Sequence, residues 1–148
     1  VLGAMNQPFI GDRFIGLPGQ TTLNGNAIKA RACKKFEQAT LGITEESMMK
    51  TEAQRSAYKK IADQVGYLRL GGDCYNYALL AAGFIDLVIE GDLMAWDIQA
   101  LIPIVEGAGG VITLWDGAPV RAGGWVVAAG DAELHAQAID ILKDAAPG

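Results

Sequence analysis

Hydrophobic positions along residues 38–148 alternate between two periods, one typical of strands and one typical of helices. Short apolar runs predict buried strands, whereas apolar residues at i, i+3, i+4 and i+7 predict amphipathic helices. We expect strands at residues 39–44, 67–70, 85–89, 111–115 and 125–129, and helices at residues 51–64, 74–82, 96–106 and from 131 onward. This β-α-β-α-β-α-β-β-α order is typical of an α/β fold, a layered sandwich in which helices flank a mixed or parallel sheet.

The N-terminal part of the chain follows a different pattern. Strand-like segments at residues 1–5 and 12–16 are separated by short turns, and Asn24-Gly25 is a dipeptide that closes tight hairpins. These signals predict an antiparallel meander with one face that must be covered. The sequence begins within a strand, so we expect that an upstream portion has been removed. The basic segment 29–37 is expected to be a solvated face.

Asp97 stands at the expected start of the helix 96–106, just beyond the carboxyl end of a buried strand. An Asp at a helix start most often caps the helix, but in open α/β sheets this edge is also where ligands bind. Pro103 lies inside the same helix and should kink it, although we expect burial to keep the helix intact. Glu106 is about half a turn out of phase with Asp97, so we interpret it as a solvated or structural residue.

Three strand-to-helix junctions carry polar residues: Gly71-Gly72-Asp73, Glu90-Gly91-Asp92 and Trp96-Asp97. Glycine lets a ligand approach the backbone closely, and the three junctions can converge at one edge of the sheet. A Gly-Gly pair before a helix is more often only a tight turn, and Asp73 taken alone would be interpreted as another helix cap. The residues alone leave both alternatives open.

Composition narrows the class of protein. A net charge of −5 over 148 residues, without a basic stripe, argues against a nucleic-acid-binding surface. No apolar run reaches membrane-spanning length, so no membrane partner is expected. Cys33 and Cys74 match neither a metal site nor a disulfide framework, which favours a reducing, cytoplasmic compartment. We interpret Cys74 as a core residue and His135, the single histidine, as a surface residue.

The string WDIQALIPIVEGAGG at residues 96–110 resembles the C-terminal signature of the inositol monophosphatase family of metal-dependent phosphatases, approximately WDxxAxxxIVxEAGG. In that family the Asp of the WD pair is a magnesium ligand, so the resemblance implies that Asp97 binds Mg²⁺. One departure is visible, because Gly107 replaces the acidic residue before Ala-Gly-Gly and Glu106 lies one position earlier.

Other motifs resemble the histidinol-phosphate phosphatase branch of the family: Asn6-Gln7-Pro8-Phe9, Asp12-Arg13-Phe14, GGDCY at residues 71–75 and IPIVEGAGG at residues 102–110. In the family, the stretch matching residues 70–73 lines the alcohol side of the substrate, and the Glu matching Glu90 also contacts it. The resemblance therefore implies that the substrate is bound by Gly71, Gly72, Asp73 and Glu90. Carboxylates at Asp73 and Glu90 would suit the ammonium and imidazole groups of histidinol phosphate.

The resemblance thus implies a Mg²⁺-dependent phosphomonoesterase that hydrolyses histidinol phosphate to histidinol in histidine biosynthesis. Two alternatives stay open, an inositol-1-monophosphatase and a catalytically inactive fragment or interaction module. The family's upstream Glu pair and DPxDGT segment, which supply most metal ligands, do not occur in this sequence. We reject Glu45-Glu46 as a substitute, because it follows the meander and the family's Glu pair precedes it.

We accordingly expect the C-terminal portion of the family's sugar-phosphatase fold. Residues 1–148 would form a single domain, in which residues 1–37 are the end of the N-terminal antiparallel sheet and residues 38–148 the C-terminal α/β part. The catalytic N-terminal portion would be absent, so the chain alone is expected to be inactive. The complete protein is expected to be a homodimer that acts on a small phosphorylated alcohol.

Overall fold

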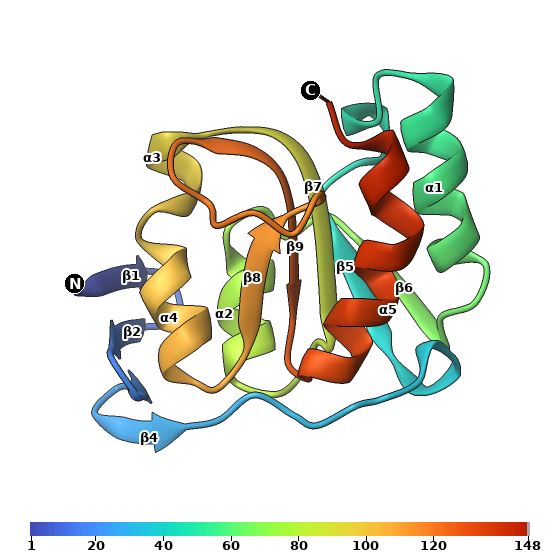
Figure 1. The fold of residues 1–148 in the computed structure, drawn as a ribbon. Coiled ribbons are helices and arrows are strands. Elements are labelled where there is room, and N and C mark those ends of the chain that lie inside the picture. Colours follow the sequence, from blue (N-terminus) through green and yellow to red (C-terminus); the bar gives the residue numbers. More distant parts are fainter. Residues whose placement is uncertain (148) are drawn as a thin grey trace.

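The computed structural model describes residues 1–147 and contains two β-sheets, with helices between and beside them (Figure 1). The first sheet has four antiparallel strands in sequential order: β1 (Gly3–Gln7), β2 (Asp12–Leu17), β3 (Gln20–Leu23) and β4 (Asn26–Ile28). Asn24 and Gly25 form the turn between β3 and β4 with φ angles of 51° and 85°, as an Asn-Gly hairpin turn requires. The predicted N-terminal meander is confirmed.

The second sheet has five strands in the order β6-β5-β7-β9-β8. They are β5 (Thr40–Ile43), β6 (Tyr67–Leu70), β7 (Leu87–Met94), β8 (Val111–Leu114) and β9 (Gly123–Ala129). Strand β5 runs parallel to β6 and β7, whereas β9 runs antiparallel to β7 and β8. The sheet is therefore mixed, and the predicted fold class is confirmed. Because β6, β5 and β7 are parallel neighbours, their carboxyl ends meet at one edge, where α/β proteins bind ligands.

Helices cover both faces of the five-stranded sheet (Figure 1). On one face, α1 (Glu52–Ala62) packs beside α5 (Ala132–Leu142), and on the other, α2 (Tyr75–Ala81) packs beside α4 (Leu101–Gly107). The four-stranded sheet contacts α4 through β1, β2 and β3 and forms the outermost layer. Helix α4 therefore joins the two sheets.

Short-range signals account for several of the helix ends. The predicted capping box begins α1, since the Thr51 hydroxyl accepts the Gln54 N–H and the Gln54 side chain accepts the Thr51 N–H. Two short 3₁₀ helices lie outside the predicted elements, η1 (Phe36–Gln38) and η2 (Glu46–Met48), and a third, η3 (Lys143–Ala145), follows α5. None of the helices within residues 1–147 has the length and apolar character needed to cross a membrane.

The helix expected at residues 96–106 is two helices in the structure, α3 (Ala95–Ile98) and α4, separated by a turn at Gln99 and Ala100. Pro103 has no N–H to donate to the carbonyl of Gln99, and its ring crowds that carbonyl. The expectation that burial would keep the helix intact is therefore wrong. Burial still determines the packing of the second segment, because Ile104 is fully buried between the sheets.

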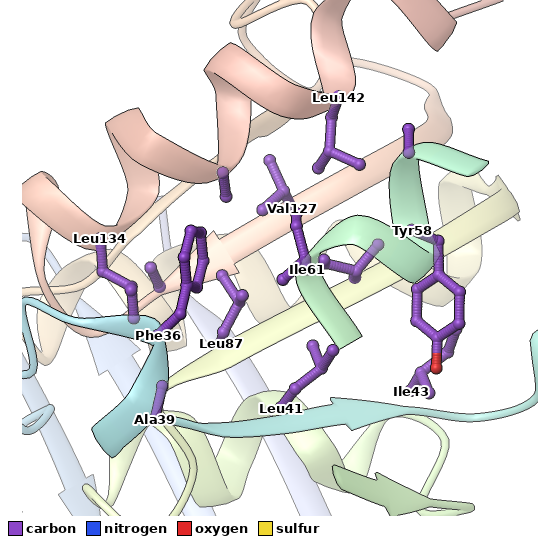
Figure 2. Packing of buried hydrophobic residues seen from close by; sticks show 14 of the residues in the cluster. Phe36, Ala39, Leu41, Ile43, Tyr58, Ile61, Leu87, Val127, Leu134 and Leu142 are labelled. Carbon is purple, nitrogen blue, oxygen red and sulfur yellow. The ribbon is translucent and has the colours of Figure 1, made fainter. Parts of the chain in front are cut away.

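The five-stranded sheet divides the hydrophobic core into two clusters. On the α1/α5 side, Leu87 of β7 packs with Ile61 of α1 and Leu134 of α5 (Figure 2). On the α2/α4 side, Val88 of β7 packs in a cluster that also includes Phe14 of β2. Successive side chains of β7 thus enter opposite clusters, as a central strand with two covered faces requires.

The expectation that the segment 29–37 is a solvated face is wrong for part of that segment. Cys33 and Phe36 are buried in the α1/α5 cluster, and Arg31 pairs with Asp86, whose side chain is fully buried. Arg31 Nε and Nη2 donate to the two Asp86 carboxylate oxygens at 2.8 and 2.5 Å, and the Thr40 N–H donates at 2.8 Å. The segment passes along the edge of the sheet where β5 and β7 begin (Figure 1), so it covers buried groups.

Candidate functional site

Glu90 lies on β7 immediately before a bulge, where the register with β9 shifts between Glu90 and Leu93. The residue is only 2% exposed, and Thr44 Oγ1 donates to Glu90 Oε1 at 2.5 Å. Burial raises the pKa of Glu90; the hydrogen bond from Thr44 opposes this shift, and the charge of Asp73 adds to it. Glu90 is therefore a buried carboxylate that offers a ligand little surface for direct contact.

The loop Gly71-Gly72-Asp73 connects β6 to α2 with three consecutive positive φ angles of 79°, 113° and 50°. Its main chain is held from two sides. The Gly71 N–H donates to the Thr44 carbonyl at 2.9 Å, and Asn76 Nδ2 donates to the Gly71 carbonyl at 3.2 Å. The Asn76 N–H also donates to the Asp73 carbonyl at 3.1 Å. These bonds fix the backbone from which the exposed Asp73 side chain projects.

Cys74 is exposed at the N-cap position of α2, so the expectation that it is a core residue is wrong. The helix begins one residue later than predicted, because the positive-φ loop extends through Asp73. Partial burial raises the pKa of the Cys74 thiol, and the charges of Asp73, Glu90 and Asp97 raise it further. Strands β6, β5 and β7 are neighbours, and Thr44, which follows β5, bonds both to Gly71 and to Glu90. The loop after β6 and Glu90 therefore meet at one edge of the sheet.

Asp97 lies in the first turn of α3, as predicted, and is exposed. Its Oδ2 accepts the N–H of Met94 at 2.8 Å, which caps the start of the helix. Asp97 therefore caps the helix, as one of the two interpretations predicted, but it uses only one of its two carboxylate oxygens to do so. Within residues 1–147, no hydrogen bond is made to Asp97 Oδ1, so that oxygen is available to a ligand.

The described residues supply only part of a metal site. Mg²⁺ takes about six oxygen ligands in near-octahedral geometry. Residues 1–147 contain no group of three or more His, Cys, Asp or Glu residues placed to hold a metal ion. The free oxygen of Asp97 suits one position in such a shell. A complete magnesium site does not fit these residues alone, and Asp97 fits one only as a single contributor.

Thr44 and Asn76 are two residues of the site that sequence reasoning missed. Thr44 bonds to both the loop and Glu90, and Asn76 anchors the loop from the first turn of α2. A signal for Thr44 was present, because it directly follows β5 at the same sheet edge as Gly71. No comparable local signal marks Asn76, since its function depends on a loop geometry that the sequence pattern does not specify.

His135 is buried, at 8% exposed, so the expectation of a surface position is wrong. Its Nε2 lies 3.0 Å from Thr113 Oγ1 on β8, and that hydroxyl donates to the Leu114 carbonyl at 2.8 Å. A hydroxyl has one hydrogen, so the imidazole donates from Nε2 in this arrangement. Burial lowers the pKa of His135. The residue lies on α5, across the sheet from α2, and takes no part in the site.

Comparison with known proteins places this geometry in a family. A model of the inositol monophosphatase family matches residues 1–145. The bifunctional phosphatase IMPL2, chloroplastic, of Arabidopsis thaliana is 44% identical over 153 aligned positions, which cover 97% of this chain and 44% of that protein. A histidinol-phosphatase of Chlorobaculum parvum is 29% identical over 110 positions, which cover 74% of this chain and 42% of that protein. The chain thus spans about half the length of the curated relatives it matches.

Solved structures agree with the sequence comparison. An inositol monophosphatase from Zymomonas mobilis superimposes with a TM-score of 0.89 at 39% identity, covering 97% of this chain and 57% of the other. Inositol monophosphate-bound SaIMPase-II superimposes with a TM-score of 0.87 at 17% identity, which shows a shared fold. The match over residues 1–145 and the likeness in fold show that this chain belongs to the inositol monophosphatase family.

Proposed function

We propose that this chain forms the substrate-binding side of a Mg²⁺-dependent phosphomonoesterase that hydrolyses histidinol phosphate to histidinol. The observation that carries the proposal is the meeting of the Gly71-Gly72-Asp73 loop and Glu90 at Thr44, which bonds to both. The exposed Asp73 carboxylate suits a cationic alcohol, and the free oxygen of Asp97 suits a metal ion.

The charge of the site favours a cationic substrate over a neutral polyol. Histidinol phosphate carries an ammonium group and an imidazole, and carboxylates form strong charge-assisted hydrogen bonds with both when they are protonated. Asp73 is exposed and uses Oδ1 for the N–H of Cys74 at 2.9 Å, so its second oxygen can accept from the ammonium group. Glu90 is buried behind the loop, where its ionised form would add negative potential that water screens only weakly.

The metal requirement is only partly met by this chain. We propose Mg²⁺ as the metal and Asp97 as one of its ligands, with the other ligands coming from outside these 148 residues. The part of the relatives that this chain leaves uncovered provides room for such ligands. On this proposal the chain is the C-terminal portion of the enzyme and is inactive alone. A homodimeric complete protein and a cytoplasmic location stay predictions.

The relatives favour two candidate substrates. Proteins named histidinol-phosphatase are found in Chlorobaculum parvum, Streptomyces coelicolor and Mycobacterium tuberculosis, at 25–32% identity, and they support histidinol phosphate. The Zymomonas mobilis inositol monophosphatase, at 39% identity, supports inositol 1-phosphate as the second candidate. An inactive fragment or interaction module is the third alternative, because residues 1–147 hold no complete metal site.

The test is phosphate release from histidinol phosphate and from inositol 1-phosphate by the complete protein with Mg²⁺. The variant Asp73→Asn removes the charge but tolerates the φ of 50° at this position, since Asn adopts the left-handed region readily. We expect it to raise KM for histidinol phosphate about tenfold or more, the effect of losing a charged hydrogen bond. The KM for inositol 1-phosphate should change little.

A second variant separates metal binding from substrate binding. Asp97→Asn keeps an oxygen for the Met94 N–H but removes the charge, and it should abolish turnover of both substrates. Glu106→Gln is the matched control, since Glu106 is an exposed carboxylate close in sequence that we assign no role. A wild-type preference for inositol 1-phosphate, or an unchanged KM in Asp73→Asn, would refute the substrate assignment. Absence of turnover of either substrate would favour the interaction module.

A further inference from the structure

Thr44 joins the two substrate-binding elements of the proposed site. It follows directly after β5, the strand that lies between β6 and β7 in the sheet. Its carbonyl accepts the N–H of Gly71, at the start of the loop after β6, at 2.9 Å. Its hydroxyl donates to Glu90 Oε1, on β7, at 2.5 Å. One residue thus bonds both to the loop after β6 and to strand β7.

The two hydrogen bonds differ in what they fix. The bond from Gly71 involves only the main chain, so it survives any substitution of the Thr44 side chain. The bond to Glu90 depends on the hydroxyl, and a hydroxyl donating to a carboxylate makes one of the shorter and stronger hydrogen bonds in proteins. Glu90 pairs with Val126 of β9 and lies immediately before a bulge where the regular ladder is interrupted.

We propose that Thr44 is a positioning residue for substrate selection, which holds the Glu90 carboxylate against the Gly71-Gly72-Asp73 loop without touching the substrate. The inference rests on the proposed function and deepens it. Asp73 projects from the loop and Glu90 from β7, so their separation is set through Thr44. Loss of the hydroxyl would let the Glu90 side chain move relative to Asp73. Because Glu90 is buried, its movement would change the negative potential that it adds at the site rather than a direct contact with the substrate.

The hydroxyl also acts on the charge of Glu90. Burial raises the pKa of Glu90, and the bond from Thr44 is the strongest influence that opposes this rise. Removing the donor would raise the pKa further, so that Glu90 becomes protonated at a higher pH. The acidic limb of the pH profile of kcat/KM for histidinol phosphate would then move to higher pH.

The test compares Thr44→Val, which has nearly the same shape but no hydroxyl, with Thr44→Ser, which keeps the hydroxyl, in the complete protein. KM for histidinol phosphate and the inhibition constant of L-histidinol should both rise about tenfold in Thr44→Val, while kcat changes by less than about threefold. Thr44→Ser should restore all three constants to within about twofold of the wild type, with its acidic limb at the wild-type pH. Thr44→Ala provides the same comparison if Thr44→Val does not fold.

The outcomes separate this inference from the proposed function. Wild-type protein that does not hydrolyse histidinol phosphate would overturn both. Active wild-type protein with unchanged constants in Thr44→Val would overturn only the role of Thr44. Equal losses in Thr44→Ser and Thr44→Val would also overturn it, because side-chain shape rather than the hydroxyl would then be responsible.

Discussion

Replacing Gly72 by alanine should destabilise the protein much more than the same replacement at its neighbour Gly71. Both residues have positive φ, 79° at Gly71 and 113° at Gly72. A Cβ at Gly71 would meet nothing within 4 Å, whereas a Cβ at Gly72 would overlap Asn76 Oδ1 and lie 2.9 Å from Asn76 Cγ. The pair therefore separates backbone strain from a steric conflict with a buried side chain.

The magnitudes follow from these surroundings. Alanine at Gly71 requires the left-handed region, which costs about 1–2 kcal/mol. At Gly72 the backbone strain is about 1–3 kcal/mol. The conflict with Asn76 adds to it, because this fully buried amide would lose its bond to the Gly71 carbonyl. An unsatisfied buried polar group costs about 1–3 kcal/mol, so the two terms together reach about 2–6 kcal/mol.

Urea denaturation of the complete protein, with the free energy of unfolding measured for both variants, tests the difference. The combination of Gly72→Ala with Asn76→Ala supplies a second comparison, since removing the amide should relieve part of the conflict. We expect a coupling energy of about 1–2 kcal/mol between the two positions, within the range for residues in contact. Equal destabilisation by Gly71→Ala and Gly72→Ala, or strictly additive effects in the double variant, would refute the reasoning.

Two further predictions concern groups far from the site. Burial lowers the pKa of His135, so the unfolded chain binds a proton that the folded chain excludes. The contribution of His135 to the free energy of unfolding should be constant above about pH 6.5 and should fall as the pH drops below that value. His135→Gln should remove this contribution in denaturation experiments. Arg31→Met leaves the fully buried Asp86 carboxylate without its cation. Because the Arg31 side chain is half exposed, we expect the free energy of unfolding to fall by about 2–4 kcal/mol, less than for a fully buried pair. Lys59→Met, which removes an exposed ion pair, should change stability little by the same measurement.

Signals contained within a few residues determined most of the secondary structure. The capping box at Thr51 and Gln54 and the turn at Asn24-Gly25 were predicted correctly, because each depends on bonds between residues at most three positions apart. The order of strands and helices from residue 38 followed from hydrophobic periodicity, and it limits the fold to a sheet with covered faces. The break before α4 was wrongly judged, although Pro103, its cause, was visible in the sequence.

Local signals and hydrophobic periodicity did not determine which polar residues are buried. His135 was expected at the surface and Arg31 on a solvated face, yet both make specific contacts in the folded chain. Asp86, the partner of Arg31, lies 55 positions away in the sequence. Periodicity describes which face of an element is apolar, but it does not say which polar residue will find a partner on a distant strand.

In the candidate site, too, the sequence predicted some features and the tertiary structure decided others. The sequence by itself indicated the three polar junctions, because glycine and carboxylate residues after buried strands mark a ligand-binding edge. Only the tertiary structure buried Glu90 against Thr44, 46 positions away, and joined Thr44 to the Gly71 loop. The physical reason is that such contacts depend on strand order and register, and residues distant along the chain meet at one edge only after β5 has paired with both β6 and β7.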